Sequence, residues 1–377
     1  MFIPRILEKT IINQLKHSKE GIIVYGPRQI GKTTLIRSII DKLSLKTLQV
    51  NGDSTQHVDV FSSQDLSKLK SAVAGYDLLF IDEAQRIDRI GINIKLLRDH
   101  IPNLKIVVTG SSSLDLASSI KESLAGRVYN YTLYPISMLE LGSTCNAHEL
   151  QLMLEERLMF GAYPKIFSLE GAQIKQEYLQ NVIDAYLYKD ILELSGIKNS
   201  RKIRDLLKLL AFQIGNQVSL AEIGNQLDMS KDTVARYIDL LEQSFVVFRL
   251  SGFSRNLRKE VRKMDKIYFY DLGIRNAVIN NFNYLKDRND AGQLWENFLI
   301  SERIKKHSYE KVYSNNYFWR THTGAELDFV EEREGKLFGF EFKYNTRKPK
   351  APKTWLKTYP NSSFNFVNLT NFLNFIT

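Results

Sequence analysis

The sequence contains a single cysteine, Cys145, and no long uninterrupted apolar run. One cysteine cannot form an internal disulfide, and it excludes zinc sites built from several cysteines. A membrane-spanning helix needs roughly 18 consecutive apolar residues, and no segment approaches that length. The first residues, MFIPRILEKT, also lack the apolar core of a secretory signal. We therefore expect a cytoplasmic protein that has no membrane partner.

The chain is long, and its charge is unevenly distributed. Its 377 residues exceed one ordinary core, which predicts two or three domains. The net charge is +10, and residues 251–377 contain 22 basic and 14 acidic side chains. Most of the positive excess therefore lies in the last third of the chain. This distribution favours a polyanionic partner, although a solvated basic surface would give the same count.

Short apolar runs alternate with amphipathic stretches in the first part of the chain. The runs GIIVYG, KTLQVN, DLLFID and LKIVVT occupy residues 21–26, 46–51, 77–82 and 104–109. Helical patterns lie between them, for example at 91–100. Strands that are apolar throughout and alternate with helices predict a parallel sheet covered on both faces. The expected fold class of this part is α/β.

A phosphate-binding pattern follows the first apolar run. The segment Gly26-Pro27-Arg28-Gln29-Ile30-Gly31-Lys32-Thr33 fits GxxxxGK[ST] at every fixed position. Glycines let the backbone approach phosphate oxygens, and a following helix points its N–H groups at the anion. We expect Lys32 to reach the β- and γ-phosphates of ATP and Thr33 to ligate Mg²⁺. A chance glycine-rich turn is the alternative, but the apolar strand before it and the helix after it favour a P-loop.

Two acids, Asp82 and Glu83, end the third apolar run. An acid at the tip of a buried strand is costly unless it meets a cation or a hydrogen-bond donor. Asp82 is predicted to bind Mg²⁺, directly or through water, and Glu83 to polarise the attacking water. The alternative is that both acids cap the next helix. Their position downstream of a P-loop favours the nucleotide role.

Two further features follow in the chain, Thr109-Gly110-Ser111-Ser112-Ser113 and Leu124-Ala125-Gly126-Arg127. A hydroxyl group of the first, such as that of Thr109, is a candidate contact for the γ-phosphate or the attacking water. A serine-rich helix cap would look the same. Arg127 is a candidate for stabilising charge on the γ-phosphate, at its own site or at that of a neighbouring subunit. An ordinary surface arginine is the alternative.

Residues 201–250 predict helices followed by a strand. RKIRDLLKLLAFQIG, VSLAEIGNQLDMS and KDTVARYIDLLEQS read as helices, and FVVFRL reads as a strand. A short helix, a turn at 228–230, a second helix and a strand outline a winged helix-turn-helix, which binds DNA or docks proteins. The segment from Ser254 to Lys266 then has six basic residues within twelve positions. It would suit a phosphate backbone, or form a solvated turn.

A second group of polar residues lies in the last third of the chain. Glu296 falls in a helical segment, QLWENFLISERIKK, and Asp328, Glu341 and Lys343 fall in the strand-like AELDFV and LFGFEFKY. Alternation along a strand puts Glu341 and Lys343 on one side, and likewise Glu326 and Asp328. This is the pattern of PD-(D/E)XK nucleases, whose carboxylates hold Mg²⁺ or Mn²⁺ and whose lysine helps activate water. Asp328 and Glu341 would be ligands, Lys343 the activator and Glu296 accessory. A structural ion pair of Lys343 is the alternative.

The segments GPRQIGKTT, LLFIDEAQ, VVTGSSS and SLAGRV, in this order and spacing, resemble the bacterial and archaeal AAA-type ATPases that carry an AAA_14 region followed by a DUF4143 region. The resemblance covers nearly the whole chain. It implies a multi-domain α/β protein with four parts. These are a P-loop ATPase core at 1–140, a helical lid-like segment at 141–200, a winged helix at 201–255, and a PD-(D/E)XK nuclease-like α/β domain at 256–377.

The resemblance also implies roles for individual residues. The nucleotide contacts would be Gly26, Pro27, Arg28, Gln29, Ile30, Gly31, Lys32, Thr33, Thr34 and Thr109, with Asp82, Glu83 and Arg127 completing the site. We therefore expect an ATPase that uses Mg²⁺ and couples ATP to nucleic-acid binding or processing, with DNA favoured over RNA. The alternative is a nucleotide-regulated switch that binds a protein and carries a non-catalytic nuclease-like domain. Oligomer formation is compatible with either reading.

Overall fold

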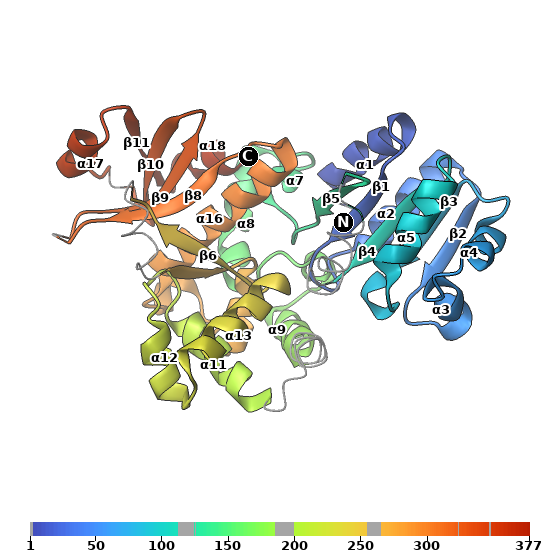
Figure 1. Ribbon diagram of the computed structural model, residues 1–377. Helices are drawn as coiled ribbons and strands as arrows, with labels where there is room; N and C mark the ends of the chain where they lie inside the picture. Colours follow the sequence, from blue (N-terminus) through green and yellow to red (C-terminus); the bar gives the residue numbers. More distant parts are fainter. Residues whose placement is uncertain are drawn as a thin grey trace. The chain divides into compact units, whose positions relative to one another are not determined.

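The computed structural model describes residues 3–111, 124, 126–184, 200–254, 265–322, 324–346 and 348–377. They form two compact units (Figure 1). The N-terminal unit comprises Phe2–Pro135 and Gln243–Phe245, and the C-terminal unit mainly Ile136–Glu242 and Val246–Thr377. None of the helices described combines the length and apolar character needed to span a bilayer.

The N-terminal unit is built on a parallel sheet. Its described strands are β1 (Gly21–Tyr25), β2 (Thr47–Asn51), β3 (Leu78–Asp82), β4 (Lys105–Gly110) and β5 (Val128–Thr132). Their order is β2-β3-β4-β1-β5, and neighbouring strands run in parallel. The four predicted strands are therefore confirmed. Because the strands are parallel, their carboxyl ends meet at one edge, where open α/β sheets bind ligands.

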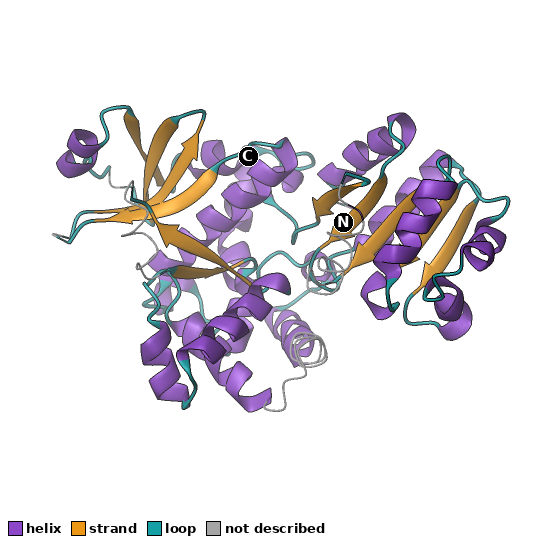
Figure 2. Ribbon diagram, viewed as in Figure 1, coloured by secondary structure: helices purple, strands orange, loops and turns teal. Residues whose placement is uncertain are grey.

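Helices cover both faces of this sheet, as predicted (Figure 2). They are α1 (Ile6–His17), α2 (Lys32–Leu43), α3 (Thr55–Phe61), α4 (Leu66–Val73) and α5 (Ile90–His100), with a 3₁₀ turn, η1, at Ala84–Arg86. Alternate strand residues such as Ile23 and Leu79 pack with Leu69 of α4 and Leu97 of α5 in one core cluster. Helix α2 contacts α1 and β4 outside that cluster. Each core side chain buried in this way stabilises the fold by roughly 1.5–3 kcal/mol.

The C-terminal unit begins with helices. They are α7 (Met138–Leu141), α8 (Ala147–Phe160) and α9 (Ala172–Val182), with a 3₁₀ turn, η2, at Pro164–Ser168. Ser137 and Asn146 start α7 and α8 with reciprocal capping boxes to Glu140 and Glu149, which satisfies the first N–H groups of each helix. The expected helical character of this region is confirmed for its described residues. Residues 185–199 of the predicted lid-like segment lie outside them.

The next elements are α11 (Ser200–Phe212), α12 (Leu220–Leu227), α13 (Lys231–Gln243), β6 (Val247–Gly252) and β7 (Lys266–Phe269). Helix α12 starts at Ser219, whose side chain accepts the Glu222 N–H, and ends at Asp228 in a left-handed conformation. The predicted turn therefore lies where the sequence placed it. Strands β6 and β7 pair in antiparallel fashion. Residues 255–264, which hold most of the predicted basic segment, are outside the described part of the chain.

Strand β6 joins these helices to a mixed sheet. The sheet adds β8 (Asn315–Arg320), β9 (Glu326–Arg333), β10 (Lys336–Lys343) and β11 (Ser362–Asn368), in the order β11-β10-β9-β8-β6-β7. The helices that follow β7 are α15 (Leu272–Val278), α16 (Ala291–Glu310), α17 (Lys353–Thr358) and α18 (Phe372–Ile376), with a 3₁₀ turn, η4, at Leu285–Asp287. Helix α16 contacts β10 and β7. Its residues therefore lie close to those of both strands.

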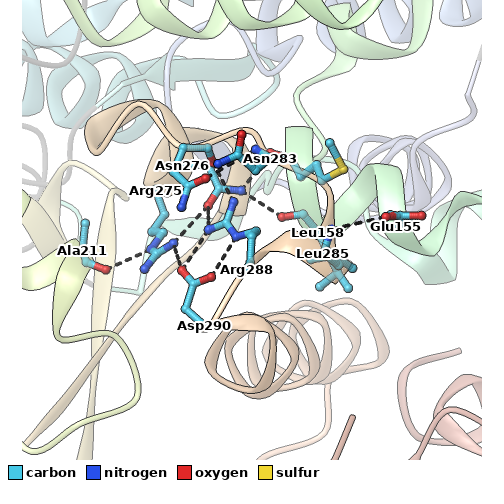
Figure 3. Close-up of polar contacts among 11 residues, drawn as sticks. Glu155, Leu158, Ala211, Arg275, Asn276, Asn283, Leu285, Arg288 and Asp290 are labelled. Atoms are coloured by element: carbon cyan, nitrogen blue, oxygen red, sulfur yellow. Dashed lines mark hydrogen bonds and ion pairs between the residues drawn. The ribbon is translucent and has the colours of Figure 1, made fainter. Parts of the chain in front are cut away.

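A buried polar network fixes the start of α16 (Figure 3). Asp290, which precedes the helix, accepts hydrogen bonds from Arg275 of α15 at 2.6 Å and from Arg288 at 2.7 Å. Burial raises the pKa of Asp290, but the two arginines outweigh it and lower this pKa to about 2. Asn276 ties the same network to the backbone of α8. The network thus holds the first turns of α16, which carry Glu296, in a defined place.

Candidate functional site

The loop between β1 and α2 needs glycine at its two ends. Gly26 has φ +146° and Gly31 has φ +90°, conformations that other residues rarely adopt. A Cβ on Gly26 would also lie 2.2 Å from the carbonyl oxygen of Leu133. The predicted contact residues Gly26 to Thr34 form this loop and the first turn of α2. The open backbone and the helix N-terminus face the carboxyl edge of the sheet, as an anion site requires.

Lys32 is the first residue of α2, and its side chain is buried, with 4% of the residue exposed. Its Nζ donates to the carbonyl oxygens of Gly26 and Pro27, each at 2.9 Å. The ammonium group thus lies inside the curve of the loop, where its protons would also meet a phosphate. Arg5 supports the loop from outside, because its guanidinium donates to the carbonyl of Ile30 at 2.9 Å. The sequence offered no signal for this role of Arg5.

Three oxygen-bearing side chains meet beside the loop. The Thr33 hydroxyl donates to Asp82 Oδ2 at 2.8 Å, and the Thr109 hydroxyl donates to Asp82 Oδ1. The strand order explains this meeting, because β4 lies between β1 and β3 and puts Thr109 next to both strand ends. Hydroxyl and carboxylate oxygens are ligands that Mg²⁺ prefers. The donor set at Thr33 and Asp82 therefore fits the metal that the sequence predicted there.

Glu83 follows Asp82 in a strained turn. Its φ is +51°, and its carbonyl oxygen would lie 2.3 Å from a Cβ on Gly52. The Glu83 N–H donates to the Thr109 hydroxyl at 3.3 Å. The side chain of Gln85 donates to Glu83 Oε2 and, at 2.9 Å, to the hydroxyl of Ser111. Sequence reasoning missed Gln85, although it lies in the quoted segment LLFIDEAQ. Of the predicted serine loop, 112–113 lie outside the described residues.

Arg127 lies at the other edge of the sheet. Its carbonyl oxygen accepts the N–H of Gly21, the first residue of β1, whereas the P-loop follows the last residue of that strand. A strand of five residues spans about 15 Å, so Arg127 is far from its own P-loop. Its side chain is 40% exposed and pairs with Asp99 at 3.0 Å. The sequence left open a role at the chain's own nucleotide, a role at that of a neighbouring subunit, and an ordinary surface arginine. This position separates Arg127 from its own P-loop, and its exposed ion pair with Asp99 is typical of a surface arginine.

The second group of predicted residues also comes together. Glu296, Glu326, Asp328, Glu341, Lys343 and Lys266 line one cavity of about 610 Å³ in the C-terminal unit, which we call the acidic pocket. Asp328 Oδ2 accepts the Phe342 N–H at 2.7 Å, and Lys343 Nζ donates to Glu341 Oε1 at 2.6 Å. Burial, and then the charges of Glu296 and Glu341, raise the pKa of Asp328 well above its usual value.

Lys266 corrects one prediction. The sequence placed it in a solvent-facing basic segment, but only 4% of its side chain is exposed. Its Nζ lies 3.2 Å from Glu296 Oε1 and 2.8 Å from Glu326 Oε1. Burial lowers the pKa of Lys266, but these carboxylates outweigh it, so its pKa is raised. The local run of basic residues misled the prediction because the burial of Lys266 depends on its contacts with Glu296 of α16 and Glu326 of β9, which are distant in sequence.

Two side chains hold the carboxylate of Glu296. The Tyr268 hydroxyl donates to the same oxygen, Oε1, that Lys266 approaches. Burial raises the pKa of Glu296 in spite of the lysine. Within the residues that the structure describes, no three histidine, cysteine or acidic side chains form a group that could hold a metal ion. The predicted ligands Asp328 and Glu341 line the same cavity, and proteins can hold Mg²⁺ by one or two carboxylates together with water.

A parallel-sheet core with a P-loop at its carboxyl edge defines the class of P-loop nucleotide-binding proteins, and comparison with known families narrows it. The AAA domain family AAA_14 matches residues 18–142. Two domains of unknown function, DUF8612 and DUF4143, match residues 151–285 and 291–370. The chain therefore carries an AAA_14 region followed by a DUF4143 region, in the order that the sequence motifs implied. This confirms the resemblance seen in the sequence.

Individual relatives extend over different parts of the chain. An uncharacterized protein of Mycobacterium tuberculosis, Rv2008c, is 29% identical over 346 residues, covering 91% of this chain and 74% of that protein. The Holliday junction branch migration complex subunit RuvB of Ehrlichia chaffeensis is 26% identical over 155 residues, 41% of each chain. Among solved structures, the Walker-type ATPase PABY2304 of Pyrococcus abyssi matches with a TM-score of 0.48 and 14% identity, covering 74% of this chain and 96% of that chain.

Proposed function

We propose that the protein binds ATP with Mg²⁺ at the P-loop and hydrolyses it. The observation that carries this proposal is the meeting of Thr33, Asp82 and Thr109 beside a buried Lys32. Lys32 and the first N–H groups of α2 would bind the phosphates, and Thr33 and Asp82 would hold the metal. The metal would neutralise phosphate charge. Glu83 would orient the attacking water and take its proton.

The proposal is tested by measuring phosphate release with ATP, with and without Mg²⁺. Duplex DNA, single-stranded DNA and RNA are then added separately. ATP turnover that requires Mg²⁺ supports the nucleotide site. Acceleration by one nucleic acid supports coupling, and no turnover under any of these conditions contradicts the proposed activity.

We further propose that ATP controls contact with nucleic acid, and DNA in particular. Helices α12 and α13, followed by the β6–β7 pair, have the element order of a winged helix. An isolated antiparallel bridge between Gln217 and Lys266 lies where such a module has a short third strand. The partial likeness to RuvB, named as a Holliday junction branch migration subunit, favours DNA over RNA. The basic excess of the last third supports a polyanionic partner.

The acidic pocket would give this protein a metal-dependent nuclease activity. Asp328 and Glu341 would hold Mg²⁺ or Mn²⁺, and Lys343, on the same side of β10 as Glu341, would help activate water. Metal-dependent nicking of a supercoiled plasmid is expected to fall about 10²- to 10⁴-fold in Lys343→Ala, because a positioned proton-transfer group is lost. Nicking should persist in Lys32→Ala. The control is Lys336→Ala, an exposed lysine at the other end of β10.

The second candidate is a nucleotide-regulated switch that binds a protein through the same helices, with a non-catalytic C-terminal domain. The pairing of Lys343 with Glu341, together with that of Lys266 with Glu296 and Glu326, favours it, because both lysines already neutralise carboxylates. Equal nicking by the parent protein and by Lys343→Ala, together with loss of DNA retention at moderate salt, would favour this switch over the nuclease.

We also propose that Arg127 acts on the nucleotide of a neighbouring copy. Arg127→Ala should lower ATP turnover at least tenfold, since such arginines contribute about 10³- to 10⁵-fold to phosphoryl transfer. Mixing it with Lys32→Ala should restore turnover, because each variant supplies what the other lacks. The measurement is phosphate release by the mixture and by each variant alone. Arg89→Ala, which removes another exposed arginine of this unit, is the control, and full turnover by Arg127→Ala contradicts the role.

A further inference from the structure

We infer that Lys266 is a built-in cation of the acidic pocket. Its ammonium group occupies the place that a second metal ion would take between Glu296 and Glu326, so the pocket binds one divalent cation, at Asp328 and Glu341. This inference rests on the metal binding proposed above and deepens it. It predicts how many divalent ions the acidic pocket binds, and it gives Lys266 a role inside this pocket.

The contacts of Lys266 are those of a bridging cation. Its Nζ lies 2.8 Å from Glu326 Oε1 and 3.2 Å from Glu296 Oε1, so one positive charge joins two carboxylates from β9 and α16. The group also lies 5.2 Å from the centre of the Phe318 ring. A buried cation with two carboxylates and an aromatic face is satisfied where it is. Glu296 and Glu326 are thereby compensated without a metal.

The backbone of Lys266 is held from two sides. It pairs with Leu250 of β6 and forms the antiparallel bridge to Gln217. Since only 4% of its side chain is exposed, the ammonium group cannot leave for solvent without a shift of β7. The Tyr268 hydroxyl, two residues further on the same strand, donates to the oxygen of Glu296 that Lys266 approaches. These contacts make Glu296 a positioning residue for the lysine.

Lys343 is different. It also pairs with a pocket carboxylate, Glu341, but 40% of its side chain is exposed. It can therefore move into solvent and release Glu341 to a metal ion. The second candidate ligand, Asp328, accepts one hydrogen bond through Oδ2 from the Phe342 N–H and lines the same cavity. Glu341 can therefore exchange Lys343 for a metal ion, whereas Glu296 and Glu326 keep the buried Lys266.

The test counts Mn²⁺ ions bound by the full chain, using the electron paramagnetic resonance signal of free Mn²⁺. An Asp82→Asn background removes the contribution of the nucleotide site. We expect one ion in this parent, one in Lys266→Arg, which keeps the charge, and two in Lys266→Met, which keeps only the stem. Lys266→Met combined with Glu326→Gln should return to one ion, because one of the two carboxylates that Lys266 compensated has lost its charge.

The outcomes separate the two proposals. One ion in both the parent and Lys266→Met overturns the role of Lys266 and leaves the proposed metal site intact. No ion in the parent overturns both. If Lys266→Met does not fold alone, refolding with Mn²⁺ should recover its circular dichroism spectrum, since the ion takes the place of the ammonium group. Failure to recover with Mn²⁺, while Lys266→Arg folds normally, overturns the inference.

Discussion

Replacing Lys32 with alanine is expected to lower the affinity for ATP about 10- to 150-fold and to abolish measurable turnover. The lost contact is a charge-assisted hydrogen bond to phosphate, which contributes about 1.5–3 kcal/mol. The side chain is buried inside the loop and bonded to the carbonyl oxygens of Gly26 and Pro27. No other lysine of the loop can replace it, because the pattern provides one.

Affinity is measured by titration with a fluorescent ATP analogue, and turnover by phosphate release. The control is Lys42→Ala in the same helix, an exposed lysine whose ion pair with Glu8 contributes little. Thermal unfolding of both variants separates loss of binding from loss of fold. Unchanged affinity and turnover in Lys32→Ala would mean that the phosphates bind elsewhere.

The P-loop and the parallel sheet could be predicted because short local sequence patterns determine both. Strands buried on both faces are apolar throughout, as in residues 78–81, and the loop needs glycine at fixed positions. Strand β5 escaped prediction because it is partly exposed at the sheet edge and reads VYNYT. The meeting of Thr33, Asp82 and Thr109 depends on β4 lying between β1 and β3, and no local pattern encodes that order.

The acidic pocket shows the same division between local and long-range information. Alternation along β10 was enough to put Glu341 and Lys343 on one side, and they are in contact. Alternation could not place Lys266, because it follows a segment rich in basic residues, whereas its side chain contacts Glu296 and Glu326 in space. Burial of such a charge is decided by contacts between strand β7, helix α16 and strand β9, far apart in the chain.

Replacing Glu83 with glutamine is expected to retain ATP while turnover falls about 10²- to 10⁴-fold, the usual contribution of a positioned base. The amide has nearly the same shape and can still accept the hydrogen bond from Gln85, which links this side chain to Ser111. The backbone is also held, since Glu83 lies in a left-handed turn packed closely against Gly52. The substitution therefore removes the proton acceptor and leaves the geometry in place.

The experiment pairs single-turnover hydrolysis with ATP binding in Glu83→Gln, next to Glu170→Gln, an exposed glutamate of the other unit. Unchanged ATP binding with slow hydrolysis in Glu83→Gln identifies a residue that acts in the chemical step alone. Lys32→Ala, in contrast, should lower both ATP binding and hydrolysis. Rapid turnover by Glu83→Gln would mean that another group at this edge of the sheet acts as the proton acceptor. Thr109 and Ser111 are two such groups, because the Thr109 hydroxyl accepts the Glu83 N–H and Ser111 accepts a hydrogen bond from Gln85, which also donates to the Glu83 carboxylate.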